Sequence, residues 1–257
     1  MSLLKPAITF LLSFALAACA SSGASPNRKH EPDSPKQDAA EVQVKMGRGY
    51  MDQGQFETAH QKLERGLELD PNSVDGHTLM AVLYERIDRA KLSEKHYKRA
   101  VELDPADGST NNNYGAYLCR IGRYAEADTY FLRALDDPFY KTPESAYSNA
   151  GVCAAHAGEI EKSEVYFRKS LDTNPKDAGT LYQMALINFK KNDYMRARAF
   201  MQRFESANQP EASAIDLAAQ IEERLGDTAA AAKYRERLKT EFPDYTPGIT
   251  TKGPNSP

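Results

Sequence analysis

A 34-residue internal repeat is the feature of this 257-residue sequence that most restricts its fold. Small residues recur at one position of each repeat, separated by 34, 34, 36, 34 and 34 residues; they are Gly47, Ala81, Gly115, Gly151, Ala185 and Ala219. Seven positions later each repeat has a turn-forming residue; these are Gly54, Asp88, Gly122, Gly158, Asn192 and Gly226. A period of this length is typical of arrays in which one supersecondary unit stacks on the next.

The second half of each repeat completes a helical hairpin pattern. A second small residue lies twelve positions after the first, and a large apolar residue follows it in the first five repeats, at Leu63, Tyr97, Phe131, Phe167 and Met201. Asp-Pro or Asn-Pro pairs end several units, because the residue before a proline is disfavoured in a helix. The pattern resembles the tetratricopeptide repeat. That resemblance implies an all-α, right-handed α-solenoid of about six helix-turn-helix units over residues 41–243, with units beginning near residues 40, 74, 108, 144, 178 and 212.

Two repeats depart from the pattern. Two extra residues lie between the third and fourth units, within the segment from Asp136 to Pro143, and predict a bulge or a sharper bend there. The sixth unit has Glu222 where tyrosine is usual and Arg235 where an aromatic or long apolar residue is expected. We therefore expect the sixth unit to be the solvating cap that a solenoid requires at its end.

The first twenty residues predict export and lipid attachment. Lys5 precedes an apolar run over residues 7–18, which is shorter than the roughly 20 residues needed to cross a bilayer. A charged residue before a short apolar run is typical of an export signal. The run ends in Leu16-Ala17-Ala18-Cys19, which resembles the lipobox of bacterial lipoproteins and implies that residues 1–18 are a signal peptide and that Cys19 carries covalent lipid. The alternative is an ordinary secretory signal with an incidental cysteine.

The residues after Cys19 predict a location and a tether. In enteric-type bacteria, Asp at the next position retains a lipoprotein at the inner membrane, so by resemblance Ala20 predicts the periplasmic face of the outer membrane. Residues 19–40 are rich in Ser, Pro, Lys and Asp and lack an apolar period, which predicts a flexible tether with a reach of roughly 25 Å. Residues 244–257 predict a flexible tail.

Composition and motifs argue against nucleic-acid binding and catalysis. The chain has 33 Lys and Arg against 36 Asp and Glu, whereas a nucleic-acid binder normally carries a basic excess. No glycine-rich phosphate loop is present, and the five histidines, at positions 30, 60, 77, 96 and 156, do not cluster in sequence. Cys153 and His156 are three residues apart without a second ligand pair. We therefore expect no catalytic residue, no metal site, no small-molecule substrate and no cofactor besides the lipid on Cys19.

In the tetratricopeptide family, the first helix of each unit lines the concave face of the solenoid. The resemblance therefore implies a protein-binding groove lined by residues of the first helices. The projected groove residues are Thr78, Val82, Arg86, Asn112, Asn113, Ala116, Arg120, Ser148, Val152, His156, Tyr182, Leu186, Phe189 and Lys190. Tyr182, Leu186 and Phe189 predict an exposed apolar site for a peptide or helix, with contact to the neighbouring repeat as the alternative. The Asn112–Asn113 pair predicts a functional contact, with capping and inter-repeat hydrogen bonding as the alternative.

Two cysteines one repeat apart predict a disulfide. Cys119 and Cys153 lie 34 residues apart, at nearly equivalent heights on the first helices of the third and fourth units. Neighbouring helices pack about 8–10 Å apart, so inward-pointing cysteines at these positions can meet. Export would place them in an oxidising compartment. The alternative is a pair of buried free thiols that fill small-residue positions.

A narrower resemblance combines the lipobox, the tether and the repeats. The segment Asn112-Asn113-Tyr114-Gly115-Ala116-Tyr117-Leu118-Cys119, the insertion, and Asn149-Ala150-Gly151-Val152-Cys153 are similar to segments of the type IV pilus biogenesis and stability lipoproteins, the pilotins of the pilus secretin. This resemblance implies a non-enzymatic outer-membrane factor whose protein partner is the secretin subunit. It further implies a role in secretin localisation and multimerisation, and hence in pilus biogenesis and twitching motility.

Two other functions remain possible at this point. One is a general periplasmic tetratricopeptide scaffold for cell-wall or outer-membrane assembly proteins, whose groove recruits a different partner by the same physics. The other is an enzyme carried on a helical solenoid, which would require an activity that depends on His156 and Cys153.

Overall fold

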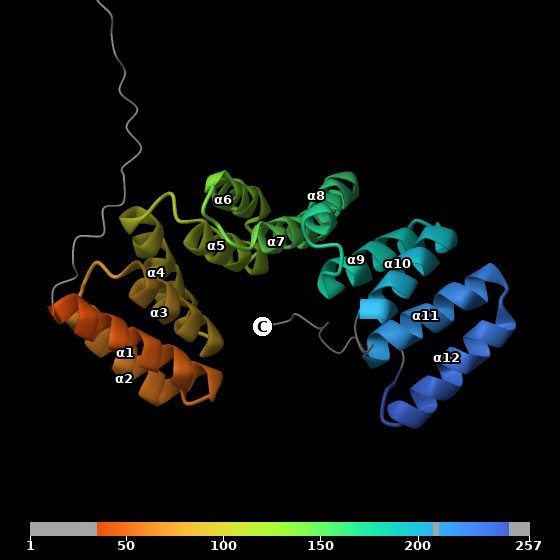
Figure 1. Cartoon of the computed structure of the whole chain (residues 1–257), viewed down its shortest axis with the longest axis horizontal. Helices are drawn as coiled ribbons and strands as arrows, with labels where there is room; N and C mark the ends of the chain where they lie inside the picture. The colour runs from red at the N-terminus through yellow and green to blue at the C-terminus, as the bar shows by residue number, and fades with distance from the viewer. Residues whose placement is uncertain (1–34, 208–210, 247–257) are drawn as a thin grey trace, which may run out of the picture. The chain divides into compact units, whose positions relative to one another are not determined.

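The computed structural model describes residues 35–207 and 211–246, and this part contains twelve α-helices and no strand (Figure 1). The helices are α1 (Pro35–Asp52), α2 (Phe56–Leu69), α3 (Val74–Arg86), α4 (Ala90–Leu103), α5 (Gly108–Arg120), α6 (Tyr124–Asp136), α7 (Pro143–His156), α8 (Ile160–Thr173), α9 (Ala178–Lys190), α10 (Tyr194–Ala207), α11 (Ala212–Leu225) and α12 (Thr228–Glu241). The predicted all-α fold of six helical hairpins is confirmed.

The helices form two layers. Consecutive helices pair as hairpins, from α1 with α2 to α11 with α12, and each first helix also contacts the first helix of the next unit. Second helices of neighbouring units are joined at a few places by side chains only: Asp128 of α6 accepts hydrogen bonds from Lys162 and Tyr166 of α8, and Glu205 of α10 accepts one from Tyr234 of α12. The first helices therefore form the continuous layer of the solenoid, and the second helices cover it on one side.

The turn inside each hairpin has the predicted chemistry. Gly54, Gly122, Gly158 and Gly226 have φ between 72° and 81°, which is the left-handed region that glycine enters at little cost. The corresponding residues of the second and fifth units, Asp88 and Asn192, also have positive φ, at 56° and 60°. Asp and Asn tolerate this conformation better than most residues, so all six turns use one geometry.

The small residues bring the two helices of a hairpin into close contact. A Cβ added to Gly151 would lie 2.6 Å from the ring of Phe167, and one added to Gly115 would lie 2.8 Å from the ring of Phe131. Such a separation is too short for a real contact, so these positions need glycine as long as the facing ring stays in place. The predicted pairing of the small residue with the apolar residue of the return helix is thus observed.

The first helix begins earlier than predicted. The sequence places a tether over residues 19–40, whereas α1 begins at Pro35 and buries Ala40 to 2% exposure. Proline suits the first turn of a helix because its fixed φ is helical and the missing N–H would have no intrahelical partner there. The predictions for residues 1–34 and 247–257, including the signal peptide and Cys19, lie outside the described residues.

The insertion between α6 and α7 forms a short turn around Asp137. One carboxylate oxygen of Asp137 accepts a 2.9 Å hydrogen bond from the Phe139 N–H, and the other accepts a 2.9 Å bond from the Gly108 N–H at the start of α5. The Tyr140 side chain packs against Gly108. The Phe139 side chain is 81% exposed. The extra residues are thus tied back to the third unit, as a bulge rather than as a free loop.

The sixth unit differs from the predicted solvating cap at one residue. Glu222 is 7% exposed, and its carboxylate accepts two hydrogen bonds from the Arg198 guanidinium of α10, one of them at 2.9 Å. Glu222 does not face solvent, because its position is still turned toward the preceding unit and an ion pair with Arg198 takes the place of the tyrosine. The outer helix α12 buries only Ala231 and Leu238, as a terminal helix can.

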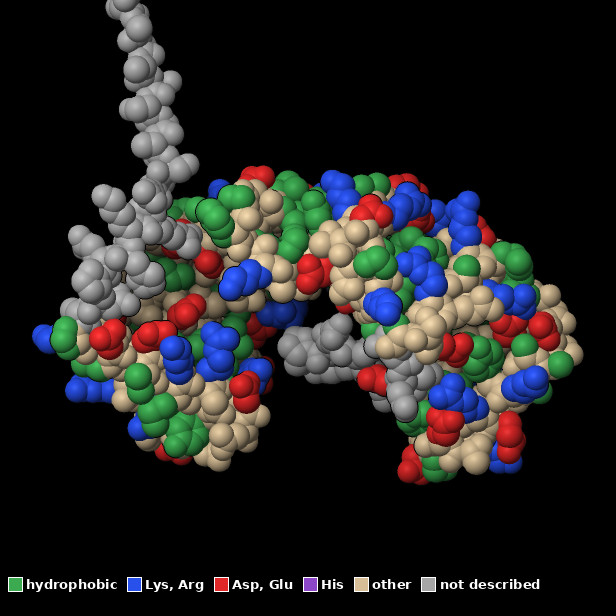
Figure 2. Space-filling view, in the orientation of Figure 1, with side chains coloured by type: hydrophobic (Ala, Val, Ile, Leu, Met, Phe, Trp, Pro, Cys, Tyr) green, Lys and Arg blue, Asp and Glu red, His purple; other side chains and the backbone are tan. Residues whose placement is uncertain are grey.

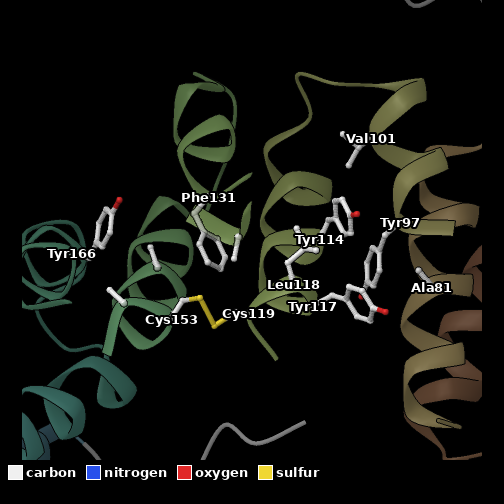
Figure 3. Packing of buried hydrophobic residues seen from close by; sticks show 13 residues of the cluster. Ala81, Tyr97, Val101, Tyr114, Tyr117, Leu118, Cys119, Phe131, Cys153 and Tyr166 are labelled. Carbon is white, nitrogen blue, oxygen red and sulfur yellow. A yellow bond between two sulfur atoms is a disulfide. The ribbon is translucent and has the colours of Figure 1, made fainter. Parts of the chain in front are cut away.

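Tyrosines dominate the core of the second and third units (Figure 3). The ring of Tyr97 lies 5.7 Å from that of Tyr114 and 5.2 Å from that of Tyr117, between centroids. The Tyr117 hydroxyl donates to the carbonyl of Ala90 at 3.0 Å, and the Tyr97 hydroxyl donates to Glu85 at 3.3 Å. The Tyr97 and Tyr117 rings thus bury apolar surface while their hydroxyls keep hydrogen-bond partners.

Candidate functional site

The Cys119–Cys153 disulfide links the third and fourth units. It joins α5 to α7 with a Cα–Cα distance of 5.6 Å, and both residues are buried (Figure 3). The bond lies at the unit junction that contains the insertion, so this junction is held both by the covalent link and by the turn around Asp137.

Three of the projected groove residues make side-chain hydrogen bonds between neighbouring units. Asn112 is 8% exposed and accepts a 3.0 Å hydrogen bond from the Asn149 side-chain amide of α7. Thr78 is buried, with its hydroxyl 3.4 Å from that of Thr110. Ser148 accepts a 3.0 Å bond from the Thr180 hydroxyl. For the buried Asn112 and Thr78 the groove prediction is wrong, and for Asn112 the alternative of inter-repeat hydrogen bonding is what the structure shows. Ser148 is half-buried, and its place in the groove stays a prediction.

The physical reason is the rotation of each first helix about its axis. Asn112 lies one residue before Asn113, which corresponds to about 100° of rotation in an α-helix. Asn112 therefore points into the contact between α5 and α7, while Asn113 is only half-buried. Asn113 is the member of the pair that remains available to a partner.

Four apolar residues at equivalent positions form a partly exposed row on the first helices, which we name the inner row: Val82, Ala116, Val152 and Leu186. Each is half-buried and packs on the core with one side. The inner row therefore offers a partner a narrow apolar surface that needs no rearrangement. Together with Asn113, it is a part of the projected groove that the structure leaves accessible.

The apolar site predicted on α9 is not a freely exposed patch. Tyr182, Leu186 and Phe189 are all half-buried against the core of the last units. The Tyr182 ring lies 6.1 Å from that of Phe204, and the Phe189 ring lies 5.5 Å from that of Tyr194. Burial raises the pKa of the Tyr182 hydroxyl. The neighbour-contact alternative thus accounts for most of the surface of these three side chains.

Charged groove residues gather at the end of the first helices. Arg86, Arg120, His156 and Lys190 are exposed and each lies in the last turn of its helix, where the helix dipole favours a cation. Arg86 donates a 3.2 Å hydrogen bond to the Met51 carbonyl at the end of α1, and Arg120 forms an ion pair with Glu85 of α3. These two arginines therefore also hold neighbouring units together.

A histidine cluster in the first two units escapes sequence reasoning. His60 of α2 and His96 of α4 contact Tyr84 of α3, and His77 of α3 contacts His96. The Nε2 atom of His60 lies 2.9 Å from the Tyr84 hydroxyl, and the Nδ1 atoms of His77 and His96 are 2.9 Å apart. Burial lowers the pKa of His77, and burial followed by the charge of His77 lowers that of His96 to about 4. The spacing of these histidines along the chain gives no signal of the cluster, because their contacts depend on how the two hairpins stack.

The described residues offer little else to chemistry. Within residues 35–207 and 211–246, no group of three or more His, Cys, Asp or Glu side chains is arranged to hold a metal ion, and no helix is long and apolar enough to cross a membrane. Figure 2 shows Lys and Arg side chains interspersed with Asp and Glu over the visible face. The surface in that view thus carries no single-sign field of the kind that favours nucleic acid.

Comparisons with known proteins agree with this geometry. Family models described as tetratricopeptide repeats match residues 47–88, 74–107, 96–129 and 117–178. The type IV pilus assembly protein PilF of Pseudomonas aeruginosa is 29% identical over 239 residues, which cover 93% of this chain and 94% of PilF. An uncharacterised protein of Haemophilus influenzae is 27% identical and covers 74% of this chain.

Two solved structures share both fold and sequence similarity. The structure of Pseudomonas aeruginosa PilF has a TM-score of 0.76 and 28% identity, and covers 82% of this chain and 96% of that one. The structure of PilW, a widely conserved type IV pilus biogenesis factor, has a TM-score of 0.75 and 27% identity, and covers 80% of this chain and 94% of that one. The chain is therefore a tetratricopeptide-repeat protein whose relatives include type IV pilus assembly and biogenesis proteins.

Proposed function

We propose that this chain is an outer-membrane lipoprotein that promotes localisation and multimerisation of the type IV pilus secretin, and so supports pilus biogenesis and twitching motility. The observation that carries the proposal is the alignment with PilF, which spans 93% of this chain and 94% of that type IV pilus assembly protein. The likeness to PilW, a type IV pilus biogenesis factor of the same fold, supports it.

The proposed mechanism is protein capture at a membrane, without a chemical step. Lipid on Cys19 would hold the chain to the outer membrane, and about three acyl chains anchor far more firmly than one. A secretin segment would bind along the inner row and beside Asn113. Confinement of both proteins to one surface raises the effective concentration of secretin subunits, which favours their assembly into a ring.

The inner row fits such a partner. Its residues Val82, Ala116, Val152 and Leu186 recur at one position of four successive units, so an extended or helical apolar segment would meet equivalent contacts along its length. The exposed basic residues at the helix ends, such as Lys190, would then favour acidic residues at the edge of that segment. Both features suit a protein partner, which supports a non-enzymatic role.

Deletion of the gene tests the proposal. We expect heat-resistant secretin multimers to disappear from the outer-membrane fraction and twitching motility to be lost. The wild-type gene should restore both, while a Cys19→Ala variant should mislocalise and restore neither fully. Normal multimers and pili in the deletion strain would reject the pilus role and favour a general periplasmic scaffold.

A substitution in the inner row tests where the partner binds. Ala116→Arg should abolish secretin multimers without unfolding the chain, because the larger side chain covers the row. Asp172→Arg, an exposed position on α8, is the matched control for added charge and should leave multimers intact. If multimers persist with Ala116→Arg while the thermal midpoint of the chain is unchanged, the inner row is not the binding surface.

A further inference from the structure

The histidine cluster of the first two units is not required by the repeat pattern or by the proposed partner binding. Its two central members, His77 and His96, come from the two helices of one hairpin, α3 and α4. Their Nδ1 atoms are 2.9 Å apart, and both rings are half-buried. Two imidazole nitrogens this close share a hydrogen bond, and once the proton between them is displaced both can act as ligands of one metal ion.

The hydrogen bonds define which ring atoms carry protons. The Nε2 atom of His77 lies 3.1 Å from the Pro71 carbonyl oxygen. A carbonyl only accepts, so Nε2 of His77 carries the proton, and the Nδ1 atom of the neutral ring presents its lone pair. His96 must then donate its Nδ1 proton to His77 across the 2.9 Å contact.

We propose that His77 and His96 form a two-histidine site for a transition-metal dication. Zinc–nitrogen bonds of about 2.0–2.1 Å at a tetrahedral angle place two ligand nitrogens about 3.3 Å apart. The observed 2.9 Å therefore needs only a small outward rotation of the rings. On binding, the proton on Nδ1 of His96 moves to its Nε2 atom, so the ring stays neutral and no redox change occurs.

The surroundings of the site support ligation. Metal-binding histidines usually donate their second ring N–H to a carbonyl or carboxylate, which fixes the ring, and His77 already makes this bond to Pro71. The Nε2 atom of His96 has no hydrogen-bond partner among residues 35–207 and 211–246, so it is free to take the proton. Water molecules would complete the coordination, since only two protein ligands are present.

The chemistry of the site selects the metal. Imidazole nitrogens suit Cu²⁺, Ni²⁺ and Zn²⁺, whereas Mg²⁺ and Ca²⁺ prefer oxygen ligands. The charges of Lys95 and Arg99 reach the two rings and oppose a cation, while the charge of Asp70 favours one. We therefore expect moderate affinity, with Cu²⁺ bound more tightly than Zn²⁺, and no measurable binding of Mg²⁺. This site is an addition to the sequence prediction, which contained no metal ligand.

Metal titration of the untagged full-length chain in detergent tests the site. In equilibrium dialysis against Zn²⁺ or Cu²⁺, we expect one equivalent to bind, and either His77→Gln or His96→Gln to weaken binding more than tenfold. His156→Gln removes an exposed histidine on α7 and is the matched control, which should bind as the wild type does. Absence of saturable binding, or equal binding by all four proteins, would overturn the proposal.

Footprinting of the wild-type chain gives a test that does not depend on the folding of variants. Diethyl pyrocarbonate modifies accessible imidazole nitrogens, and mass spectrometry locates each product. Zn²⁺ should protect His77 and His96 from modification and leave His156 unprotected. Equal modification of all three residues with and without Zn²⁺ would overturn the proposal.

Discussion

Removal of the Cys119–Cys153 disulfide should lower the free energy of unfolding by about 3–4 kcal/mol. The bond closes a loop with a sequence separation of 34 residues, and in the chain-entropy treatment a loop of that length constrains the unfolded chain by about 4 kcal/mol. Alanine fits both positions because each side chain is small and buried beside other small residues. The double variant Cys119→Ala, Cys153→Ala therefore loses the link with little additional packing change.

Urea denaturation followed by far-ultraviolet circular dichroism measures this loss. The double variant should unfold at a lower urea concentration than the oxidised wild type, and a reducing agent should shift the wild type toward the variant. The same agent should leave the variant unchanged, which controls for effects on the rest of the chain. Free energies of unfolding that agree within about 0.5 kcal/mol would refute the reasoning, because the link would then not constrain the unfolded chain.

Three further predictions concern packing and charge. Gly151→Ala should destabilise the fold by about 1–3 kcal/mol in urea denaturation, because the new Cβ would lie 2.6 Å from a core ring, whereas Gly49→Ala, with no atom within 4 Å, should be neutral or stabilising. Glu222→Ala should cost about 2–3 kcal/mol in the same assay, because the partly buried Arg198 loses its main partner. Burial lowers the pKa of His96 from 6.5 to about 4, so the unfolded chain binds this proton more readily between those values. Its contribution to stability is present above pH 6.5 and lost as the pH falls toward 4, and His96→Gln should flatten the urea midpoint against pH over that window.

The repeat pattern predicts the hairpins well because each of its elements has a local cause. A residue with positive φ, such as Asn192, must lie in the turn, and a glycine such as Gly115 must lie where a ring of the return helix approaches. The repeat pattern also places Cys119 and Cys153 at nearly equivalent heights on adjacent first helices, four residues after Gly115 and two after Gly151, and the structure joins them. Height along a helix is what a repeat of fixed length determines.

Rotation about the helix axis is what the period leaves open. Asn112 and Asn113 are adjacent and differ little in height along α5. Asn112 nevertheless points toward α7, whereas Asn113 is partly exposed. The same uncertainty affects Tyr182, whose surface is shared with Phe204 of the following helix. Burial between units depends on contacts with residues of the next unit, which a single repeat does not contain.

Contacts between units also explain the histidine cluster. His60 and His96 lie on second helices of different units, and Tyr84 of the intervening first helix brings them together. Their separation along the chain matches neither a helical spacing nor a metal-binding motif. Only the stacking of the two hairpins makes them neighbours.

Binding of the full-length chain in detergent to purified type IV pilus secretin subunit tests the central claim most directly. The account predicts saturable binding by the wild-type chain and a loss of more than tenfold in affinity with Ala116→Arg, while Asp172→Arg binds normally. Absence of saturable binding, or equal affinity for all three proteins, would contradict the account.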